Sequence, residues 1–394
     1  MFLSLGDQPP ANAFLHEDQL VQPEHCWPLN PQVCLNCGLI QIPNVLRADF
    51  FRDYLDVPSA SVALHQHFAG LAAMVRQSLA KRSTDLVVDI GSNDGLFLWK
   101  LKECGGRGLG IEPATSLADV ASRRGIDVVL ECFDAETARA VRSAHGAASV
   151  ITATNILNHI DDLHAFMAAV MILLDPSGTF IVEVPYAGDL LEANEFDTIH
   201  HERLSEFTVK SFVDLFECFD MEVIDIARLA VHGGSLRVFG RRRIPGTPPS
   251  PVAEDWMSRE ERMALFDVAT YDAFAERVQA MKVRTLELLQ TLLTDGRSIA
   301  GYGAPAKGNT LLNYYGIGPE TLTYLVDRNP RKHGLFSPGK HIPVVPVYHV
   351  LEDQPDYLLL LAWSSQEEIM RQQRLYRYRG GTFIVPIPEP RIVA

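Results

Sequence analysis

The sequence predicts an α/β protein in which a doubly wound, Rossmann-like domain lies between a small N-terminal module and a second, smaller Rossmann-like domain. Three observations support this prediction. Short apolar runs alternate with helical patterns in the middle of the chain, the alternation restarts after a proline-rich stretch, and the first residues are rich in proline, asparagine and cysteine. We place the three domains at residues 1–60, 61–245 and 246–394.

The composition is that of an ordinary globular protein. The chain has 394 residues, of which 47% are hydrophobic and 21% charged. With 35 basic and 49 acidic residues its formal net charge is −14, which lacks the basic footprint of nucleic-acid binders. No apolar run reaches the roughly 18 residues of a membrane span, and residues 1–7 do not read as a signal peptide. We expect a cytoplasmic protein that binds neither nucleic acid nor membrane, with its oligomeric state open.

The N-terminal module contains a candidate half of a zinc site. Cys34 and Cys37 form a C-x2-C turn, in which two thiolates can bind one tetrahedral zinc ion. A structural site needs two more ligands. Cys26, His16 and His25 are near in sequence, but no second C-x2-C pair precedes them. A structural zinc ion and a metal-free turn therefore both remain open.

The central domain begins with a helix at 61–79, where apolar residues recur every three or four positions. The apolar run at 86–90 is its first strand, because the sequence Gly-Ser-Asn-Asp-Gly ends it. Later elements follow the same alternation, which indicates parallel strands joined by helices. We expect further helices at 96–104, 116–124 and 163–174, and strands at 108–111, 128–130, 150–152 and 179–184.

Four prolines between residues 245 and 251 exclude a helix or central strand and indicate a linker that begins near residue 241. Helical periodicity without glycine or proline then extends over 257–293, which predicts one long bridging helix. After it the alternation of strands and helices restarts. We expect strands at 298–301, 323–326, 357–362 and 382–385, with a turn at 303–308 and a helix through residue 312.

The turn after the first central strand is the main candidate for a ligand site. Its glycines let the backbone approach a ligand beside the free N–H groups of a helix N-terminus. Glu112 ends the next strand, where its carboxylate can accept hydrogen bonds from both hydroxyls of a ribose. An acidic residue opens the motif and Asn93 replaces the middle glycine of dinucleotide binders, so the pattern favours S-adenosylmethionine (SAM) over NAD. The predicted cofactor-binding residues are Asp89, Gly91, Ser92, Asn93, Gly95, Glu112 and Pro113. The alternative is an unliganded packing turn.

Later strand ends add further candidates. Asp134 follows the third strand, where it is placed either to accept from the amino group of an adenine or to cap the next helix. Asn155 follows the fourth strand, at the edge where doubly wound sheets bind ligands, and is a candidate cofactor contact. His159 is either a proton shuttle or a structural histidine.

Three separated motifs carry a family resemblance. They are Val88-Asp-Ile-Gly-Ser-Asn-Asp-Gly95, Val231-His-Gly-Gly-Ser-Leu-Arg237 and Gly301-Tyr-Gly-Ala-Pro-Ala-Lys-Gly-Asn-Thr-Leu-Leu-Asn-Tyr-Tyr-Gly316. Together they resemble the SAM-dependent sugar C-methyltransferases that act on nucleotide-linked deoxyketosugars of the dTDP type, over essentially the whole chain. The resemblance implies a zinc-binding N-terminal module, a SAM-binding methyltransferase domain, and a C-terminal Rossmann-like domain without its own methyl donor. Of the zinc ligands, only Cys34 and Cys37 carry over.

The resemblance implies methylation of carbon beside a ketone, in which a base removes the α proton and a donor holds the enolate oxygen. The family's Tyr-His-Glu-His motif reads His200-His201-Glu202-Arg203 here. The usual base is thus an arginine, which stays protonated at neutral pH. Three interpretations are open: His200, His201 or Glu202 is the base; the substrate differs and Arg203 binds an oxyanion or a carboxylate; or the chain binds a sugar nucleotide without catalysis. A solvated polar helix start is the structural alternative.

The remaining candidates concern the substrate. The sequence at 232–235 ends a strand, and His232, beside two glycines, is either a sugar contact or a turn histidine bonded to backbone. Lys307, in the C-terminal glycine turn, can meet a diphosphate as a point charge. The other substrate-binding candidates are Tyr54, Tyr186 and Asn309. No acidic ribose partner follows the turn at 303–308 convincingly, so we interpret the C-terminal domain as a wall of the sugar-nucleotide cleft. An NAD-dependent oxidoreductase that uses this turn is the alternative enzyme.

Overall fold

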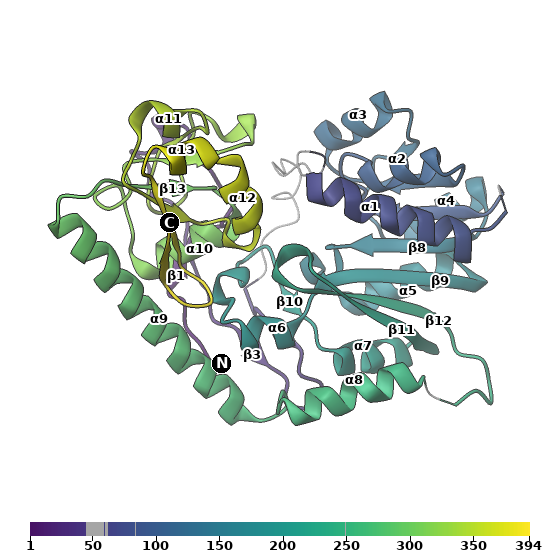
Figure 1. Ribbon diagram of the computed structural model, residues 1–394. Helices are drawn as coiled ribbons and strands as arrows, with labels where there is room; N and C mark the ends of the chain where they lie inside the picture. The colour runs from purple at the N-terminus through teal and green to yellow at the C-terminus, as the bar shows by residue number, and fades with distance from the viewer. Residues whose placement is uncertain (45–58, 60–61, 83, 249) are drawn as a thin grey trace.

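The computed structural model describes residues 1–44, 59, 62–82, 84–248 and 250–394. Figure 1 shows two α/β lobes, the central domain in blue and teal and the C-terminal domain in light green and yellow. The long helix α9 (Val268–Thr294) leads from the first lobe to the second along one side of the molecule (Figure 1). The predicted fold class, two Rossmann-like domains with a small N-terminal module, is confirmed.

The central sheet has seven strands in the order β11-β12-β9-β8-β5-β6-β7. Strand β5 (Leu86–Ile90) lies inside the sheet between β8 and β6, and all five of its residues are buried, as expected for a parallel strand covered on both faces. Neighbouring strands of the sheet are parallel, except that β12 pairs antiparallel with β9 and with β11. The other strands are β6 (Arg107–Ile111), β7 (Val128–Val129), β8 (Ala148–Thr154), β9 (Leu174–Pro185), β11 (Met221–Leu229) and β12 (Ser235–Arg242).

The helices of this domain connect the parallel strands. Those predicted from periodicity are α1 (Val62–Met74), α2 (Leu96–Glu103), α3 (Thr115–Arg123) and α5 (Leu163–Leu173). Two more helices, α6 (Ala187–Glu192) and α7 (Val209–Glu217), were not predicted, and α4 (Ala135–His145) is the helix that the capping interpretation of Asp134 requires. The hairpin of β11 and β12 was also missed, and Arg241 and Arg242, assigned above to the linker, end β12.

The prediction of one long helix over 257–293 is wrong. The structure has α8 (Pro251–Arg262) followed by α9, with a turn between them. Ala264 adopts a φ of 54°, outside the helical range. The Asp267 carboxylate accepts from the N–H of Ala269 and caps the new helix. The break therefore arises from a cap and one left-handed residue, which the absence of glycine and proline concealed.

The C-terminal sheet has six strands in the order β15-β14-β13-β16-β17-β18. Its strands are parallel apart from β18, which pairs antiparallel with β17. The strands are β13 (Ile299–Tyr302), β14 (Leu325–Asp327), β15 (Val344–Pro346), β16 (Tyr357–Leu360), β17 (Thr382–Val385) and β18 (Arg391–Val393). The helices are α10 (Ala306–Tyr315), α11 (His349–Asp353), α12 (Gln366–Gln372) and α13 (Arg374–Tyr378). Helix α10 starts at the glycine-rich turn predicted from the sequence.

The N-terminal segment contacts both lobes. Its short strands are β1 (Asp7–Gln8), β2 (Trp27–Pro28), β3 (Gln32–Val33) and β4 (Ile40–Gln41). Strand β4 pairs with β10 (Ser205–Glu206) of the central domain, and the N–H of Leu15 donates to the carbonyl of Phe336 in the C-terminal domain at 3.0 Å. None of the helices in the described ranges is long and apolar enough to cross a membrane.

Candidate functional site

A cavity of about 740 Å³ lies between the carboxyl edge of the central sheet and the C-terminal domain. This volume suits a cofactor together with part of a substrate. The predicted site residues that line it are Asp89, Gly91, Ser92, Asn93, Glu112, Pro113, Asn155, His200, His201, Arg203 and Lys307. The wall thus combines turns after β5, β6 and β8 with a loop near residue 200 and the start of α10.

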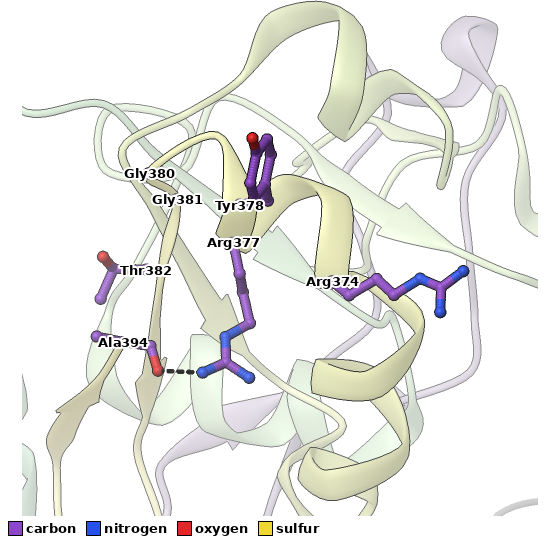
Figure 2. Close-up of a pocket in the computed structure, with 7 residues that line it drawn as sticks. All are labelled: Arg374, Arg377, Tyr378, Gly380, Gly381, Thr382 and Ala394. Atoms are coloured by element: carbon purple, nitrogen blue, oxygen red, sulfur yellow. Dashed lines mark hydrogen bonds between the residues drawn. The ribbon is translucent and has the colours of Figure 1, made fainter.

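A smaller hollow of about 380 Å³ lies at the C-terminal end of the chain (Figure 2). There Arg377 donates to a terminal oxygen of Ala394 at 2.5 Å. Arg374 and Tyr378 point away from that pair. The hollow is shallow and open, so we place the functional site in the larger cavity.

Asp89 makes one end of the large cavity favourable to a cation. The register of the sheet sets Thr152 of β8 beside Asp89 of β5, and the Thr152 hydroxyl donates to the Asp89 carboxylate at 2.6 Å. Burial raises the pKa of Asp89 to about 7, with the charges of Glu112 and Glu183 acting in the same direction. A positive group bound nearby would favour the ionised carboxylate.

Glu112 is held in a fixed orientation at the end of β6. Its carboxylate oxygens accept from the N–H groups of Asn93 and Ala114, each at 2.9 Å. Burial raises the pKa of Glu112, and these two hydrogen bonds oppose the rise. Each carboxylate oxygen has a second acceptor site, so Glu112 can accept from two vicinal hydroxyls.

The backbone of the first turn requires residues that tolerate left-handed conformations. Gly91 has a φ of 66°, and a Cβ there would lie 2.1 Å from Cδ1 of Ile156. Gly95 has a φ of 75° and is the residue before α2; it packs against Ala121 and does not line the cavity. Asn155 also adopts a positive φ, and its buried Oδ1 has no hydrogen-bond partner among the described residues. That unpaired acceptor on the cavity wall fits a polar ligand.

Two aromatic rings in contact form an apolar part of the cavity wall, called the apolar slot below. Phe133 and Phe166 line the cavity and meet edge to face, with ring centroids 5.3 Å apart. Asp134 does not line the cavity; its Oδ1 accepts from the N–H groups of Glu136 and Thr137 and caps α4. The structure therefore favours the capping interpretation of Asp134. An apolar slot, a fixed carboxylate and a cation-favouring carboxyl fit the adenine, ribose and methionine parts of SAM.

The loop around residue 200 supplies the opposite end. His200 lines the cavity, and its buried Nδ1 has no hydrogen-bond partner in the described part of the chain. Burial lowers the pKa of His200 well below 6.5, and the charge of Arg203 adds to this. A ring nitrogen of His201 instead faces the Pro28 carbonyl at 3.4 Å, and its ring meets Trp27 edge to face. Burial also lowers the pKa of His201.

Glu202 does not line the cavity. Its two oxygens accept from the backbone N–H of Asn12, at 2.9 Å, and from the side-chain amide of Asn12. The Glu202 carbonyl contacts Nδ1 of His159, a cavity residue whose pKa is lowered to about 4 by burial and by Arg203. Asn12 itself lines the cavity. Sequence reasoning missed Asn12, because the residues around it give no sign of a partner far along the chain.

Two cations face this end. An Nη of Arg203 lies 3.9 Å from the Glu206 carboxylate, whose pKa burial raises to about 7. Lys307 lies over the ring of Trp363, with its Nζ 4.3 Å from the centroid. Burial lowers the pKa of Lys307, whereas the charges of Asp197 and Glu195 oppose the change. The cavity wall thus carries the carboxyl groups of Asp89 and Glu112 in one part (below, the acidic end) and the cations Arg203 and Lys307, each with carboxyl groups nearby, in another (below, the basic end).

Other predicted substrate residues lie elsewhere. Tyr186 is buried against Trp256, with ring centroids 5.6 Å apart, and does not line the cavity. Asn309 is also buried away from it and donates to the Ala11 carbonyl at 2.7 Å, which anchors the N-terminal segment. Tyr54 and the side chain of His232 lie outside the described residues.

The two cysteines form only part of a zinc site. Cys34 and Cys37 lie in the turn between β3 and β4, and the backbone N–H of Cys37 contributes most to lowering the pKa of the Cys34 thiol. Burial raises the pKa of Cys37. Within the described ranges, no three His, Cys, Asp or Glu side chains come together in a metal-binding group. The residues present therefore do not fit a four-ligand zinc site.

Family models match the chain in three consecutive segments. They are described as "Putative zinc binding domain" at residues 1–51, "Methyltransferase domain" at residues 64–226 and "C-methyltransferase C-terminal domain" at residues 230–388. The C-methyltransferase NovU of Streptomyces niveus is 35% identical over 393 residues, which cover 100% of this chain and 94% of NovU.

Two solved structures show weaker likeness. The methyltransferase CcbJ from Streptomyces caelestis is 14% identical with a TM-score of 0.37, over 50% of this chain and 96% of its own. Magnesium protoporphyrin IX methyltransferase (ChlM) from Synechocystis PCC 6803, solved with bound SAM, is 11% identical with a TM-score of 0.35, over 46% of this chain and 80% of its own.

Proposed function

Because the chain belongs to the C-methyltransferase family that includes NovU, and is a SAM-dependent methyltransferase, we propose that it methylates a carbon atom of a nucleotide-linked ketosugar. The observation that carries the proposal is one cavity lined by Asp89 and Glu112 of the central sheet together with Arg203 and with Lys307 of the C-terminal domain. An oxidoreductase that uses the turn at 303–308 is set aside, because the family is one of methyltransferases.

At the acidic end, the residues placed to hold SAM are Glu112 for the ribose hydroxyls and Asp89 for the cationic methionine part. Phe133 and Phe166 would provide an apolar surface against which the adenine packs. The Asn155 side-chain oxygen offers a further acceptor. When bound, SAM supplies an electrophilic methyl group. The protein contributes chiefly by holding the acceptor carbon at near-attack distance, which lowers the barrier by several kcal/mol in well-oriented reactions.

At the basic end, Lys307 and Arg203 are placed to meet anionic groups of a sugar nucleotide. A diphosphate carries such groups, and so does the oxygen of an enolate formed beside a ketone. Asn12 and Thr198 line the same region, and each has a buried side-chain oxygen without a partner among the described residues. These oxygens can accept from sugar hydroxyls. Among the described residues no three possible metal ligands come together, and the proposal assigns no step to a metal.

Transfer of a labelled methyl group from SAM to a panel of thymidine-diphosphate ketosugars tests the proposal. We expect a product that gains one methyl group on a ring carbon, identified by mass spectrometry and NMR. The alternative is a scaffold that binds sugar nucleotides without catalysis, left by the arginine at the base position. Saturable binding of S-adenosylhomocysteine (SAH) and a sugar nucleotide, with no transfer to any member of the panel, would establish the scaffold.

A further inference from the structure

The group that removes the substrate proton is not determined by the resemblance, because Arg203 occupies the position of the usual base. Three of the four neighbouring candidates are engaged by other groups. Nδ1 of His159 contacts the Glu202 carbonyl, a ring nitrogen of His201 faces the Pro28 carbonyl, and the Glu202 carboxylate is held by both N–H groups of Asn12. A carbonyl oxygen only accepts, so the contacted nitrogen of His159 and of His201 carries the hydrogen, and only the other nitrogen of each ring could accept a proton. A base needs an acceptor within reach of the proton that it abstracts, and these contacts fix the orientation of both rings.

His200 meets this requirement. It lines the cavity, and its buried Nδ1 has no hydrogen-bond partner within the described residues. The N–H of Arg203 donates to the carbonyl of His200 at 2.8 Å, so both side chains emerge from one turn of the loop. Arg203 lines the same cavity, with Glu206 as its counter-charge at 3.9 Å.

We propose that His200 is the base for carbon deprotonation and that Arg203 holds the oxygen that becomes negative. This inference rests on the proposed function. The bond between hydrogen and the carbon next to the carbonyl breaks, and the proton goes to a ring nitrogen of His200. The electron pair of that bond moves to the carbonyl oxygen, where the guanidinium N–H groups donate to it. The step needs no oxidant, reductant or metal.

The charges are consistent with this assignment. Burial and Arg203 lower the pKa of His200, so the imidazole is neutral and ready to accept a proton at neutral pH. An imidazolium beside Arg203 would by itself be unfavourable. The oxyanion forms at the same moment and its negative charge attracts both cations, so the repulsion is offset only when the substrate is present.

Deuterium wash-in at the α carbon of a thymidine-diphosphate ketosugar tests the inference without the methyl donor. The sugar is incubated with protein and SAH in D2O, and its mass is followed. We expect His200→Asn and His200→Ala to exchange at least about a hundredfold more slowly than the wild type. Added imidazole should restore exchange in His200→Ala, which a purely structural role would not produce. The matched control is His145→Asn, at the exposed end of α4.

The outcomes separate this inference from the proposed function. If the wild type transfers methyl groups and His200→Asn exchanges within about threefold of it, His200 is not the base and the function stands. If the wild type neither exchanges nor transfers with any ketosugar, both fail. SAH calorimetry on each variant checks that the protein is folded. The assignment would be overturned if imidazole failed to restore exchange in His200→Ala and His201→Gln lost exchange to a similar extent.

Discussion

Removal of the Glu112 carboxylate is the most direct test of the cofactor end. Two backbone N–H groups, of Asn93 and Ala114, donate to this carboxylate at 2.9 Å, so it is oriented before a ligand binds. A hydrogen bond to a charged group contributes about 1.5–3 kcal/mol, and a ribose offers two hydroxyls. At the lower value for each bond, Glu112→Ala loses about 3 kcal/mol of binding free energy, which is roughly a hundredfold in Kd.

Isothermal titration calorimetry with SAH measures this change. The matched control is Glu136→Ala, an exposed carboxylate in the first turn of α4, which should bind SAH as the wild type does. Glu112→Ala leaves the N–H groups of Asn93 and Ala114 without this acceptor, and Ala114 is buried, so the free energy of unfolding should fall by about 1–3 kcal/mol. A folded Glu112→Ala whose Kd stays within about threefold of the wild type would refute the role of Glu112 at the ribose.

Three further changes probe the rest of the site. Burial raises the pKa of Asp89 to about 7, and a bound cation should lower that pKa. SAM binding just below pH 7 should therefore release a proton, which calorimetry in buffers of different ionisation enthalpy detects. Asp89→Asn should abolish the release. Arg203→Gln removes a charge that lowers the pKa of His200; the acid limb of deuterium exchange should move to higher pH and the plateau should fall about tenfold or more. Asn12→Ala removes the hydrogen bond from the Asn12 side-chain amide to the Glu202 carboxylate. Denaturant unfolding should show that the free energy of unfolding falls by about 1–2 kcal/mol, while the affinity for SAH stays unchanged.

The parallel parts of the fold were predictable because their strands are continuous apolar runs that end in glycine-rich turns. The antiparallel hairpin of β11 and β12 was not. Buried and partly exposed residues alternate in both strands, so no continuous apolar run marks them, and their place in the sheet depends on the register with β9. The break between α8 and α9 was not predicted for a similar reason, because Ala264 adopts a left-handed conformation that an alanine does not indicate.

The cofactor end was predictable for a geometric reason. Carboxyl ends of parallel strands meet at one edge of a sheet, so Asp89 and Glu112 had to lie close together. The substrate end depends on tertiary contacts between distant segments. Asn12 and Glu202 are 190 residues apart in the sequence, and no local pattern indicates that the N-terminal segment fixes the loop beside His200.

The charge of Arg203 limits where a substrate carbonyl can lie. At an effective dielectric constant of 20, two unit charges 4 Å apart interact by about 4 kcal/mol. Arg203 therefore opposes a protonated His200 and favours an enolate oxygen by similar amounts at equal distances. It accelerates deprotonation only if the oxygen is closer to the guanidinium than the imidazole is. A crystal structure with a ketosugar and SAH should show the carbonyl oxygen hydrogen-bonded to Arg203, with the α carbon next to a His200 nitrogen. A carbonyl directed toward Lys307 instead would leave Arg203 as a purely inhibitory charge and would contradict its role in the step.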